Sequence, residues 1–293
     1  MKKYAPLFII LAGCLWGTMG LFVRKLNAMG LSSMEIVELR CMIAALVLFP
    51  VSYFRDKSLL KIEKRNLPSL VSSGIFSIVF FNFCYFSTIS IMNLSAAAIL
   101  LYTAPIFVML MSLILFRERL TGRKVLALLM AFCGCCLVSG IMSASASLSA
   151  KGILLGLGSG FGYALYSIFS RVSFNQGLRS VTITDYTFLF AAIGGVFFTD
   201  FSAIAGALRQ YGLGFFLFAL VYTLVTTVLP YLLYTAGLQH VETGTASVMA
   251  SVEPVVATIL GFLVFSEAPS VSALVGIVLV LVALSVLNFE KKT

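Results

Sequence analysis

The sequence has few charged side chains. Of its 293 residues, only 11% are Asp, Glu, Lys or Arg, whereas 60% are hydrophobic, and the mean hydropathy is +1.07. Soluble domains carry about a quarter charged residues, because charge keeps their surfaces in water. The shortage of charge therefore excludes a soluble globular protein, and the abundance of apolar residues excludes a disordered chain.

Histidine is scarcer still, and the cysteines lie in apolar surroundings. The single histidine, His240, is far in sequence from the cysteines at 133–136, and all six cysteines fall inside hydrophobic runs. Zinc sites combine cysteine and histidine at defined spacings, and a membrane enzyme needs clustered carboxylates, histidines or a metal. We therefore predict buried free thiols, no metal site, no cofactor and no enzymatic activity.

Long hydrophobic runs dominate the chain. A bilayer core about 30 Å thick requires about 20 mostly apolar residues per helix. Ten segments meet this requirement: 4–23, 33–54, 68–90, 94–116, 124–142, 152–170, 181–200, 213–235, 244–265 and 270–288. Because the runs are continuously apolar and lack the alternation of barrel strands, we predict an all-α integral membrane protein with ten transmembrane helices.

The basic residues stand in short clusters between these runs, which indicates membrane topology rather than nucleic-acid binding, despite the net charge of +9. With the N-terminus in the cytoplasm, 15 of them lie on the cytoplasmic side: Lys2, Lys3, Arg55, Lys57, Lys61, Lys64, Arg65, Arg117, Arg119, Arg123, Lys124, Arg171, Arg179, Lys291 and Lys292. Four lie outside: Arg24, Lys25, Lys151 and Arg209. By the positive-inside rule, we predict a multi-pass protein of the plasma membrane with both termini in the cytoplasm.

The second half of the chain repeats the first. A shift of 149 residues aligns the third to fifth spans with the eighth to tenth, and it pairs Tyr85 with Tyr234, Ala97 with Ala246, Pro105 with Pro254, Phe116 with Phe265, and Glu118 with Glu267. A shift of 147 aligns the first span with the sixth, and it pairs Trp16 with Tyr163, Phe22 with Phe169, and Arg24 with Arg171. Because each half holds five spans, the predicted halves 1–145 and 146–293 must insert in opposite orientations.

The loop charges agree with this inversion. The loop at 117–124 is basic, whereas its counterpart at 266–270 has no basic residue. Inverted repeats related by an axis in the membrane plane are typical of secondary transporters, whose substrate site lies near the bilayer midplane between the repeats. We therefore predict a 5+5 inverted repeat around a shared cavity.

Two matching segments carry a family signature. Residues 96–105 have the sequence AAAILLYTAP and are followed by FRERL at 116–120, and the second half has TAS at 245–247, VEP at 252–254 and FSE at 265–267. Together with Trp16-Gly17 and Leu39-Arg40, these motifs resemble the EamA family of the drug/metabolite transporter superfamily. The resemblance implies ten helices, a 5+5 inverted arrangement, a central cavity, and export or uptake of small metabolites.

Glu253 is the leading candidate for a functional residue. It lies near the middle of the ninth span, where an ionised side chain costs about 2.5–3.5 kcal/mol on insertion scales. Its counterpart in the first half is Ala104, so the shared scaffold needs no carboxylate there. We expect either a counter-ion for a cationic solute or a protonatable coupling site. The structural alternative is a neutral carboxyl, or a pair with Arg40, that serves helix packing.

Arg40 is a second charge inside a span. It lies about two turns into the second span, with Glu38 two residues before it. We predict a structural charge pair of Arg40 with Glu38, or with Glu253 across the bundle. The alternative is a long side chain that reaches the membrane interface.

Three prolines interrupt predicted spans: Pro105, Pro230 and Pro254. Proline removes a backbone donor and bends a helix, which a membrane tolerates where the helix lines a cavity. We predict that these prolines shape the cavity or act as hinges, with simple helix curvature as the alternative.

Seven aromatic residues fall in the first, third, fourth, sixth and eighth spans, which the family resemblance implies to line the cavity: Trp16, Tyr85, Tyr102, Tyr163, Tyr166, Tyr231 and Tyr234. Tyrosine offers a ring face to cations and a hydroxyl for hydrogen bonds. With Glu253, these residues predict binding of an amine-bearing or flat aromatic solute. For any single tyrosine, anchoring at the membrane interface is the alternative.

These observations favour a secondary transporter that works by alternating access around a midplane cavity. No phosphate-binding loop of the form G-x-x-x-x-G-K-[ST] occurs, so a proton or solute gradient is the expected energy source, with protons as the candidate coupling ion. We predict efflux of small metabolites, such as amino acids, related amines or aromatic solutes. The alternatives are uptake of a similar solute and lipid flipping, and a homodimer is the oligomeric state to test.

Overall fold

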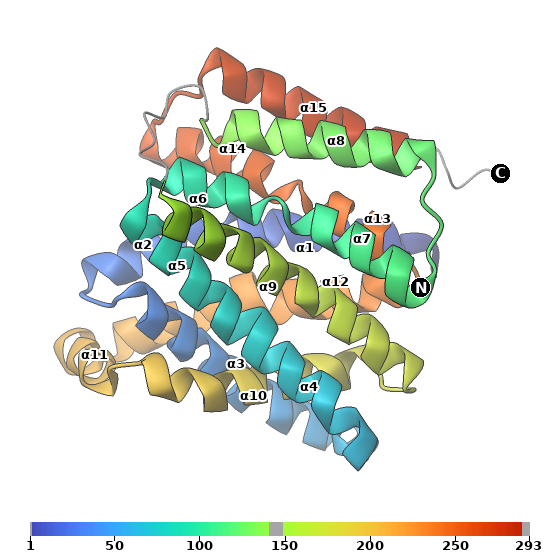
Figure 1. Ribbon diagram of the computed structural model, residues 1–293. Coiled ribbons are helices and arrows are strands. Elements are labelled where there is room, and N and C mark those ends of the chain that lie inside the picture. Colours follow the sequence, from blue (N-terminus) through green and yellow to red (C-terminus); the bar gives the residue numbers. More distant parts are fainter. Residues whose placement is uncertain (1, 141–148, 289–293) are drawn as a thin grey trace.

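The computed structural model describes residues 2–140 and 149–288, and within these ranges the chain folds into helices without a β-strand (Figure 1). The first half contains α1 (Ala5–Gly17), α2 (Met19–Ala28), α3 (Ser33–Arg55), α4 (Leu67–Gly74), α5 (Phe81–Ile91), α6 (Leu94–Leu101), α7 (Ala104–Phe116) and α8 (Gly122–Val138). The second half contains α9 (Ala150–Asn175), α10 (Ser180–Gly195), α11 (Phe201–Thr223), α12 (Leu229–Leu238), α13 (Thr243–Ala250), α14 (Glu253–Phe265) and α15 (Val271–Asn288). The predicted boundary at residues 145 and 146, together with Lys291 and Lys292, lies outside the described ranges.

Seven helical segments of the described chain are long and apolar enough to cross a membrane: Lys2–Ala28, Lys64–Ile91, Leu94–Phe116, Ala150–Asn175, Ser180–Phe198, Phe201–Leu238 and Thr243–Phe265. The helix α3 has 23 residues, but Glu35, Glu38 and Arg40 place three charges in its first half. The apolar stretches of α8 and α15 are shorter. The fold is therefore an all-helical one whose apolar helices point to a multi-pass membrane protein.

Three irregularities interrupt the helices, and each occurs twice at equivalent distances along the chain. Segments of π-helix begin at Ile75 and at Leu224. Breaks separate α6 from α7 at residues 102–103 and α13 from α14 at residues 251–252. Left-handed residues end α7 at Arg117 and α14 at Ser266. In each case the two positions are 149 residues apart.

Pro105 and Pro254 follow breaks between helices, whereas Pro230 lies within the continuous helical segment Phe201–Leu238. Pro105 and Pro254 stand at the second positions of α7 and α14, directly after the two breaks, and Pro230 stands at the second position of α12 after a π-helical segment. The first turn of a helix does not use these N–H groups, so proline is accepted there. Proline is thus compatible with the two helix starts after the breaks, and at Pro230 it follows a π-helical segment.

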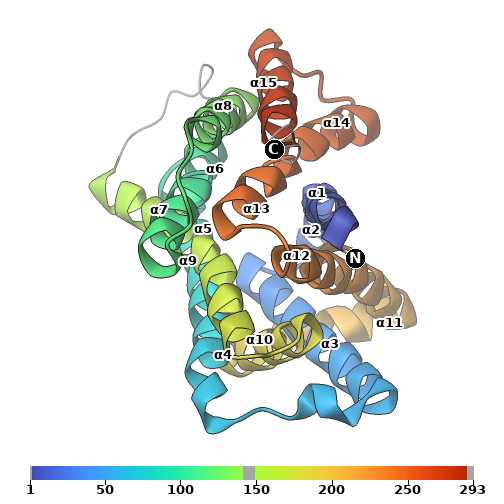
Figure 2. The same cartoon turned by 90° about the vertical axis from the view of Figure 1, so that its right-hand side faces the viewer.

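Helices of the two halves pack on one another. The helix α1 packs on α12, α9 on α5, α3 on α10, and α8 lies along α15 (Figures 1 and 2). Glycines let α1 and α9 approach the break in the opposite half: a Cβ atom on Gly13 would lie 2.9 Å from the Ala250 carbonyl oxygen, and one on Gly160 would lie 2.8 Å from that of Leu100. The two breaks are therefore held in the interior by close backbone contact.

Candidate functional site

Glu253 lies at the break between α13 and α14. It is the first residue of α14, where the helix dipole favours a carboxylate. Its carboxylate accepts a hydrogen bond from the Tyr163 hydroxyl at 3.3 Å and interacts electrostatically with Tyr85 and Tyr102. Glu253 and these three tyrosines are half-buried, and each keeps part of its surface accessible.

Trp16 of α1 lies at the centre of an aromatic cluster. Its ring centroid is 5.2 Å from that of Tyr231, 5.3 Å from that of Tyr234 and 6.3 Å from that of Tyr163. Tyr166 meets Tyr231 edge to face at 4.9 Å. Such tilted and edge-to-face contacts are favoured between aromatic rings. The rings of α1, α9 and α12 therefore form one packed aromatic surface near Glu253, which we call the wall.

The hydroxyl groups divide the predicted tyrosines into two sets. The Tyr166 hydroxyl lies 2.6 Å from that of Thr235, and the Tyr234 hydroxyl lies 2.7 Å from that of Ser167. These tyrosines, like Tyr231, are buried and belong to the wall. Tyr85, Tyr102 and Tyr163, of which Tyr163 donates a hydrogen bond to Glu253, form the accessible set.

The predicted pair between Arg40 and Glu38 is not formed. The Arg40 guanidinium donates to Asn82 Oδ1 at 3.4 Å and to Met19 Sδ at 3.7 Å, whereas neither carboxylate oxygen of Glu38 has a hydrogen-bond partner among the described residues. Residues two apart on a helix do not face each other, which is why proximity in sequence did not bring these two charges together. Glu253 interacts with Arg40 electrostatically, although no ion pair forms between them.

A second group of polar contacts closes one end of the bundle. The Glu118 carboxylate, just after α7, accepts hydrogen bonds from the backbone N–H groups of Thr243 at 2.7 Å and Gly244 at 3.1 Å. These are the first N–H groups of α13, a helix whose preceding residue, Glu242, provides no side-chain cap. Glu118 of the first half thus caps a helix of the second half.

Two basic residues extend this group. Arg171 donates to Thr243 Oγ1 at 2.9 Å, to the Leu238 carbonyl oxygen at 2.7 Å and to the Val241 carbonyl oxygen. Lys124, which is buried, forms an ion pair with Glu242. We call Glu118, Lys124, Arg171, Glu242 and Thr243 together the Glu118 end.

The equivalent residues of the repeat make different contacts. Arg24 and Glu267 form an ion pair at 2.8 Å, and both side chains are about half exposed, at 54% and 53%. Arg24 also lies over the Phe265 ring, 4.3 Å from its centroid. We call these three residues the Glu267 end. An open groove lies beside each end, of 520 Å³ at Glu118 and 480 Å³ at Arg24.

Sequence reasoning missed two roles. It did not find Asn82 as a partner of Arg40, because one amide in an apolar run has no distinguishing pattern. It also assigned no role to Glu118 and Arg171. Both residue types recur in the repeat, as Glu267 and Arg24, and this recurrence could have indicated a role for them.

Within the described ranges, no three His, Cys, Asp or Glu side chains gather closely enough to hold a metal ion.

The family can now be stated. A family model described as the EamA-like transporter family matches the chain twice, over residues 3–140 and 150–289. The chain belongs to the EamA-like transporter family. This confirms the family predicted from the motifs at 96–120 and 245–267.

Relatives in this EamA-like family are named as transporters. An uncharacterized transporter of Archaeoglobus fulgidus is 26% identical over 289 residues, which cover 94% of this chain and 92% of the relative. The pseudopaline exporter CntI of Pseudomonas aeruginosa is 24% identical and covers 100% and 98% of the two chains. A solved crystal structure with 19% sequence identity has the same fold, with a TM-score of 0.78 over 99% of this chain and 98% of the other.

Proposed function

We propose that the protein is a secondary transporter with ten membrane spans in a 5+5 inverted repeat. In this proposal α3, α8 and α15 cross the membrane in addition to the seven long apolar segments. The paired π-helical segments, breaks and left-handed residues support the repeat, because independent helices have no reason to share irregularities at one spacing. The two separate matches of the family model, at 3–140 and 150–289, support it as well.

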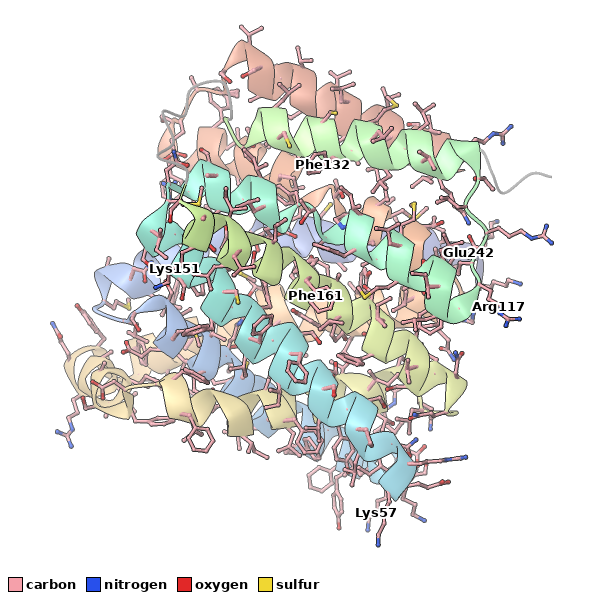
Figure 3. All side chains as sticks on the ribbon, in the orientation of Figure 1. Lys57, Arg117, Phe132, Lys151, Phe161 and Glu242 are labelled. Carbon is pink, nitrogen blue, oxygen red and sulfur yellow. The ribbon has the colours of Figure 1, made fainter. Side chains whose placement is uncertain are left out.

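The charges orient this arrangement. Arg117 and Glu242 lie at one end of the bundle and Lys151 lies at the opposite end (Figure 3). Because cytoplasmic loops carry the excess of Lys and Arg, the basic Glu118 end faces the cytoplasm. The N- and C-termini are then cytoplasmic, and the protein resides in the plasma membrane.

The difference between the two ends is the observation that carries the transport mechanism. At the Glu118 end a buried set of hydrogen bonds ties α7 and α9 to α13. At the Glu267 end a half-exposed ion pair replaces that set. We infer that a repeat whose matching ends differ in this way occupies one of two exchangeable states, here the state in which hydrogen bonds hold α7, α9 and α13 together at the cytoplasmic end.

Alternating access exchanges these contacts between the halves. In the opposite state Glu267 leaves Arg24 and caps the first N–H groups of α6 at Leu94 and Ser95, which are the repeat counterparts of Thr243 and Gly244. Glu118 then releases α13. Residues of the same type thus close either end in turn, and protons or the solute gradient supply the energy.

The site favours a small amine-bearing solute with an aromatic or apolar body. Glu253 supplies the counter-ion, and the accessible tyrosines supply ring faces that attract cations. Efflux is the proposed direction, and the relative named as a pseudopaline exporter supports it. The prolines at the two breaks, Pro105 and Pro254, shape the space beside the carboxylate.

Transport in reconstituted vesicles tests this function. Uptake of 2-phenylethylamine is measured with and without a proton gradient, for the wild type and for Glu253→Gln. We expect the substitution to lower the rate more than about tenfold, because it removes a buried charge worth about 1.5–3 kcal/mol in a hydrogen bond. Glu63→Gln, at an exposed loop carboxylate, is the matched control and keeps the wild-type rate. An unchanged rate and pH dependence in Glu253→Gln would contradict the proposal.

A further inference from the structure

Glu38 is a carboxyl group buried inside the bundle without a hydrogen-bond donor. It is the sixth residue of α3 and only 1% exposed, and neither of its carboxyl oxygens has a hydrogen-bond partner among the described residues. A buried charge is normally paired, and a buried carboxyl without a partner avoids the cost of its charge by binding a proton. The mechanism proposed above makes no use of this group.

The backbone of α10 lies directly against this carboxyl. A Cβ atom added to Gly195 would clash with Oε2 of Glu38, so only glycine leaves room for the carboxyl there. The residue 147 positions before Gly195 is the buried Leu48. The space that holds the carboxyl is thus a feature of one half and not of the scaffold that the halves share.

The matching carboxyl of the other half has a donor. Helices α3 and α10 begin at Ser33 and Ser180, 147 residues apart, so Asp185 is the counterpart of Glu38. Asp185 is also buried, but its Oδ2 accepts a hydrogen bond from the Ser52 hydroxyl of α3 at 2.6 Å, which leaves only Oδ1 without a partner. The interface between α3 and α10 therefore holds one carboxyl with a donor and one without.

The hydroxyl that corresponds to Ser52 does not serve Glu38 in this state. It belongs to Thr199, 147 residues later, and it donates to the Gly195 carbonyl oxygen at 3.0 Å. A charged carboxylate forms stronger hydrogen bonds than a neutral carbonyl group, so an ionised Glu38 would compete for this donor. The present contacts thus fit a protonated Glu38, and Thr199 offers a donor to the ionised form once α10 has moved.

The other titratable groups of α3 leave Glu38 without compensation. The Glu35 carboxylate accepts a backbone N–H at the start of its own helix at 2.7 Å. Arg40 hydrogen-bonds with Asn82 and Tyr222. The thiol of Cys41 interacts with Glu38 electrostatically, but a thiol is a weak donor.

The helices packed against α3 do not supply a partner either. Their charged groups form neither an ion pair nor a hydrogen bond with Glu38: Arg24 and Lys25 of α2, Asp185 of α10, and Arg209 of α11. The same holds for Cys84 and Tyr85 of α5, Tyr186 of α10 and Tyr211 of α11. Binding of a proton is therefore the remaining way for Glu38 to avoid a buried charge.

We propose that Glu38 binds the proton that couples transport to a proton gradient. This inference rests on the proposed transport function and deepens it, because it divides two roles between two carboxyls: Glu253 binds the solute and Glu38 binds the proton. While α10 packs on it, Glu38 is a neutral carboxyl. When the halves exchange states, α10 withdraws, the O–H bond of the carboxyl breaks, and water takes the proton. The solute crosses in one direction of this exchange and the proton in the other, so one proton enters for each solute that leaves.

Infrared difference spectroscopy tests the proton without any solute. A protonated carboxyl and a carboxylate have separate stretching bands, so a pH titration of the purified protein shows each carboxyl that loses a proton. In the wild type we expect a protonated-carboxyl band that disappears as the pH rises, and we expect Glu38→Gln to lack it. Asp185→Asn, at the same interface, is the matched control and keeps this band. A band that Glu38→Gln retains in full would overturn the inference.

Vesicles with an acid interior test the coupling. The probe is trimethyl(2-phenylethyl)ammonium, which has the charge and aromatic body of 2-phenylethylamine but no N–H proton, so it does not follow a pH difference through the lipid unaided. With one proton exchanged per probe, we expect the wild type to accumulate it up to about tenfold per pH unit, because each unit is a tenfold ratio of protons. Glu38→Gln lets the probe equilibrate without accumulation, whereas Asp185→Asn accumulates it as the wild type does.

Glu38→Met covers the case in which Glu38→Gln does not elute as a folded protein. Methionine fills the space without a polar group to satisfy, and we expect this variant to equilibrate the probe as well. Transport without accumulation by the wild type, accumulation by both Glu38 variants, or an equal loss in Asp185→Asn would overturn the role of Glu38 and leave the transport function standing. If the wild type moves neither this probe nor 2-phenylethylamine, the proposed amine solute and its coupling are both wrong.

Discussion

The Glu118 end and the Glu267 end contain equivalent residues in different surroundings. At the Glu118 end the carboxylate caps α13 and Arg171 binds carbonyl oxygens of the preceding loop. At the Glu267 end the carboxylate forms a half-exposed ion pair with Arg24, whose guanidinium also lies over the Phe265 ring. The same pair of residue types therefore ties helices of the two halves together at one end of the bundle and forms an exposed ion pair at the other.

The energies of these contacts explain why one end decides the state. A half-exposed ion pair contributes about 0–1 kcal/mol, whereas a hydrogen bond that involves a charged group contributes about 1.5–3 kcal/mol. In the proposed mechanism, most of the free-energy difference between the two states thus comes from the contacts of Glu118 and Arg171. The breaks and π-helical segments are common to both halves, so they do not favour either state.

The largest effect is expected where the halves are alike, at the glycines beside the breaks. Gly13→Val and Gly160→Val each force a side chain against backbone carbonyl oxygens 2.8–2.9 Å from the new Cβ atom. We expect each variant to lose about 3 kcal/mol of stability through overpacking and to unfold at a lower temperature in detergent. Gly20→Val is the control, because no atom lies within 4 Å of a Cβ at that position. Equal melting temperatures of all three variants would show that the breaks are not tightly held.

A smaller effect is expected where the halves differ, at the two capping glutamates. Glu118→Gln removes the charge from two hydrogen bonds to α13, and we expect it to shift the population toward the state open at that end by about 2 kcal/mol, or about 30-fold. Glu267→Gln loses only an exposed ion pair, and we expect it to change the population ratio of the two states by less than about fivefold.

The accessibility of one added cysteine measures this shift. Ser247→Cys places a thiol on α13, one turn beyond Thr243, at a position that is 5% exposed. A water-soluble thiol reagent added from the side of the Glu118 end reacts faster in the Glu118→Gln background and at the wild-type rate in the Glu267→Gln background. The same rate in both backgrounds would remove the distinction between the two ends.

Much of the fold could be predicted from the sequence because its signals are local or periodic. Apolar runs of about 20 residues specify helices, and the paired positions of Pro105 and Pro254 indicated that these two spans share an irregularity. The contacts at the two ends could not be predicted in this way. Glu118 and Glu267 occupy the same position in the repeat, so only the conformation determines which one caps a helix.

The candidate site shows the same limit. Glu253 was identified because a carboxylate in an apolar span is costly, and that argument needs no knowledge of its neighbours. The partner of Arg40 was wrong because the argument used proximity in sequence, whereas Asn82 approaches from a different helix. Long-range partners of buried polar groups depend on helix packing, which a single sequence does not encode in its local pattern.

The smallest effect is expected for an exposed pair in the loops beside α3 and α10. Asp56 accepts hydrogen bonds from the Ser58 backbone N–H at 2.9 Å and from Arg179 at 2.8 Å. These bonds, first those of Ser58 and then that of Arg179, lower the pKa of Asp56 to about 2. Since the pKa in the unfolded chain is about 3.9, the folded state holds fewer protons, and the stabilisation is complete above about pH 4.

This stabilisation is then lost as the pH falls from about 4 to about 2. We expect Asp56→Asn to melt slightly below the wild type at pH 6, and the difference to disappear at pH 2.5, as measured in an acid-stable detergent. Arg179→Gln gives a smaller difference over the same interval, because the Ser58 N–H remains bound. A difference that persists unchanged at pH 2.5 would mean that Asp56 stabilises the loops through packing rather than charge.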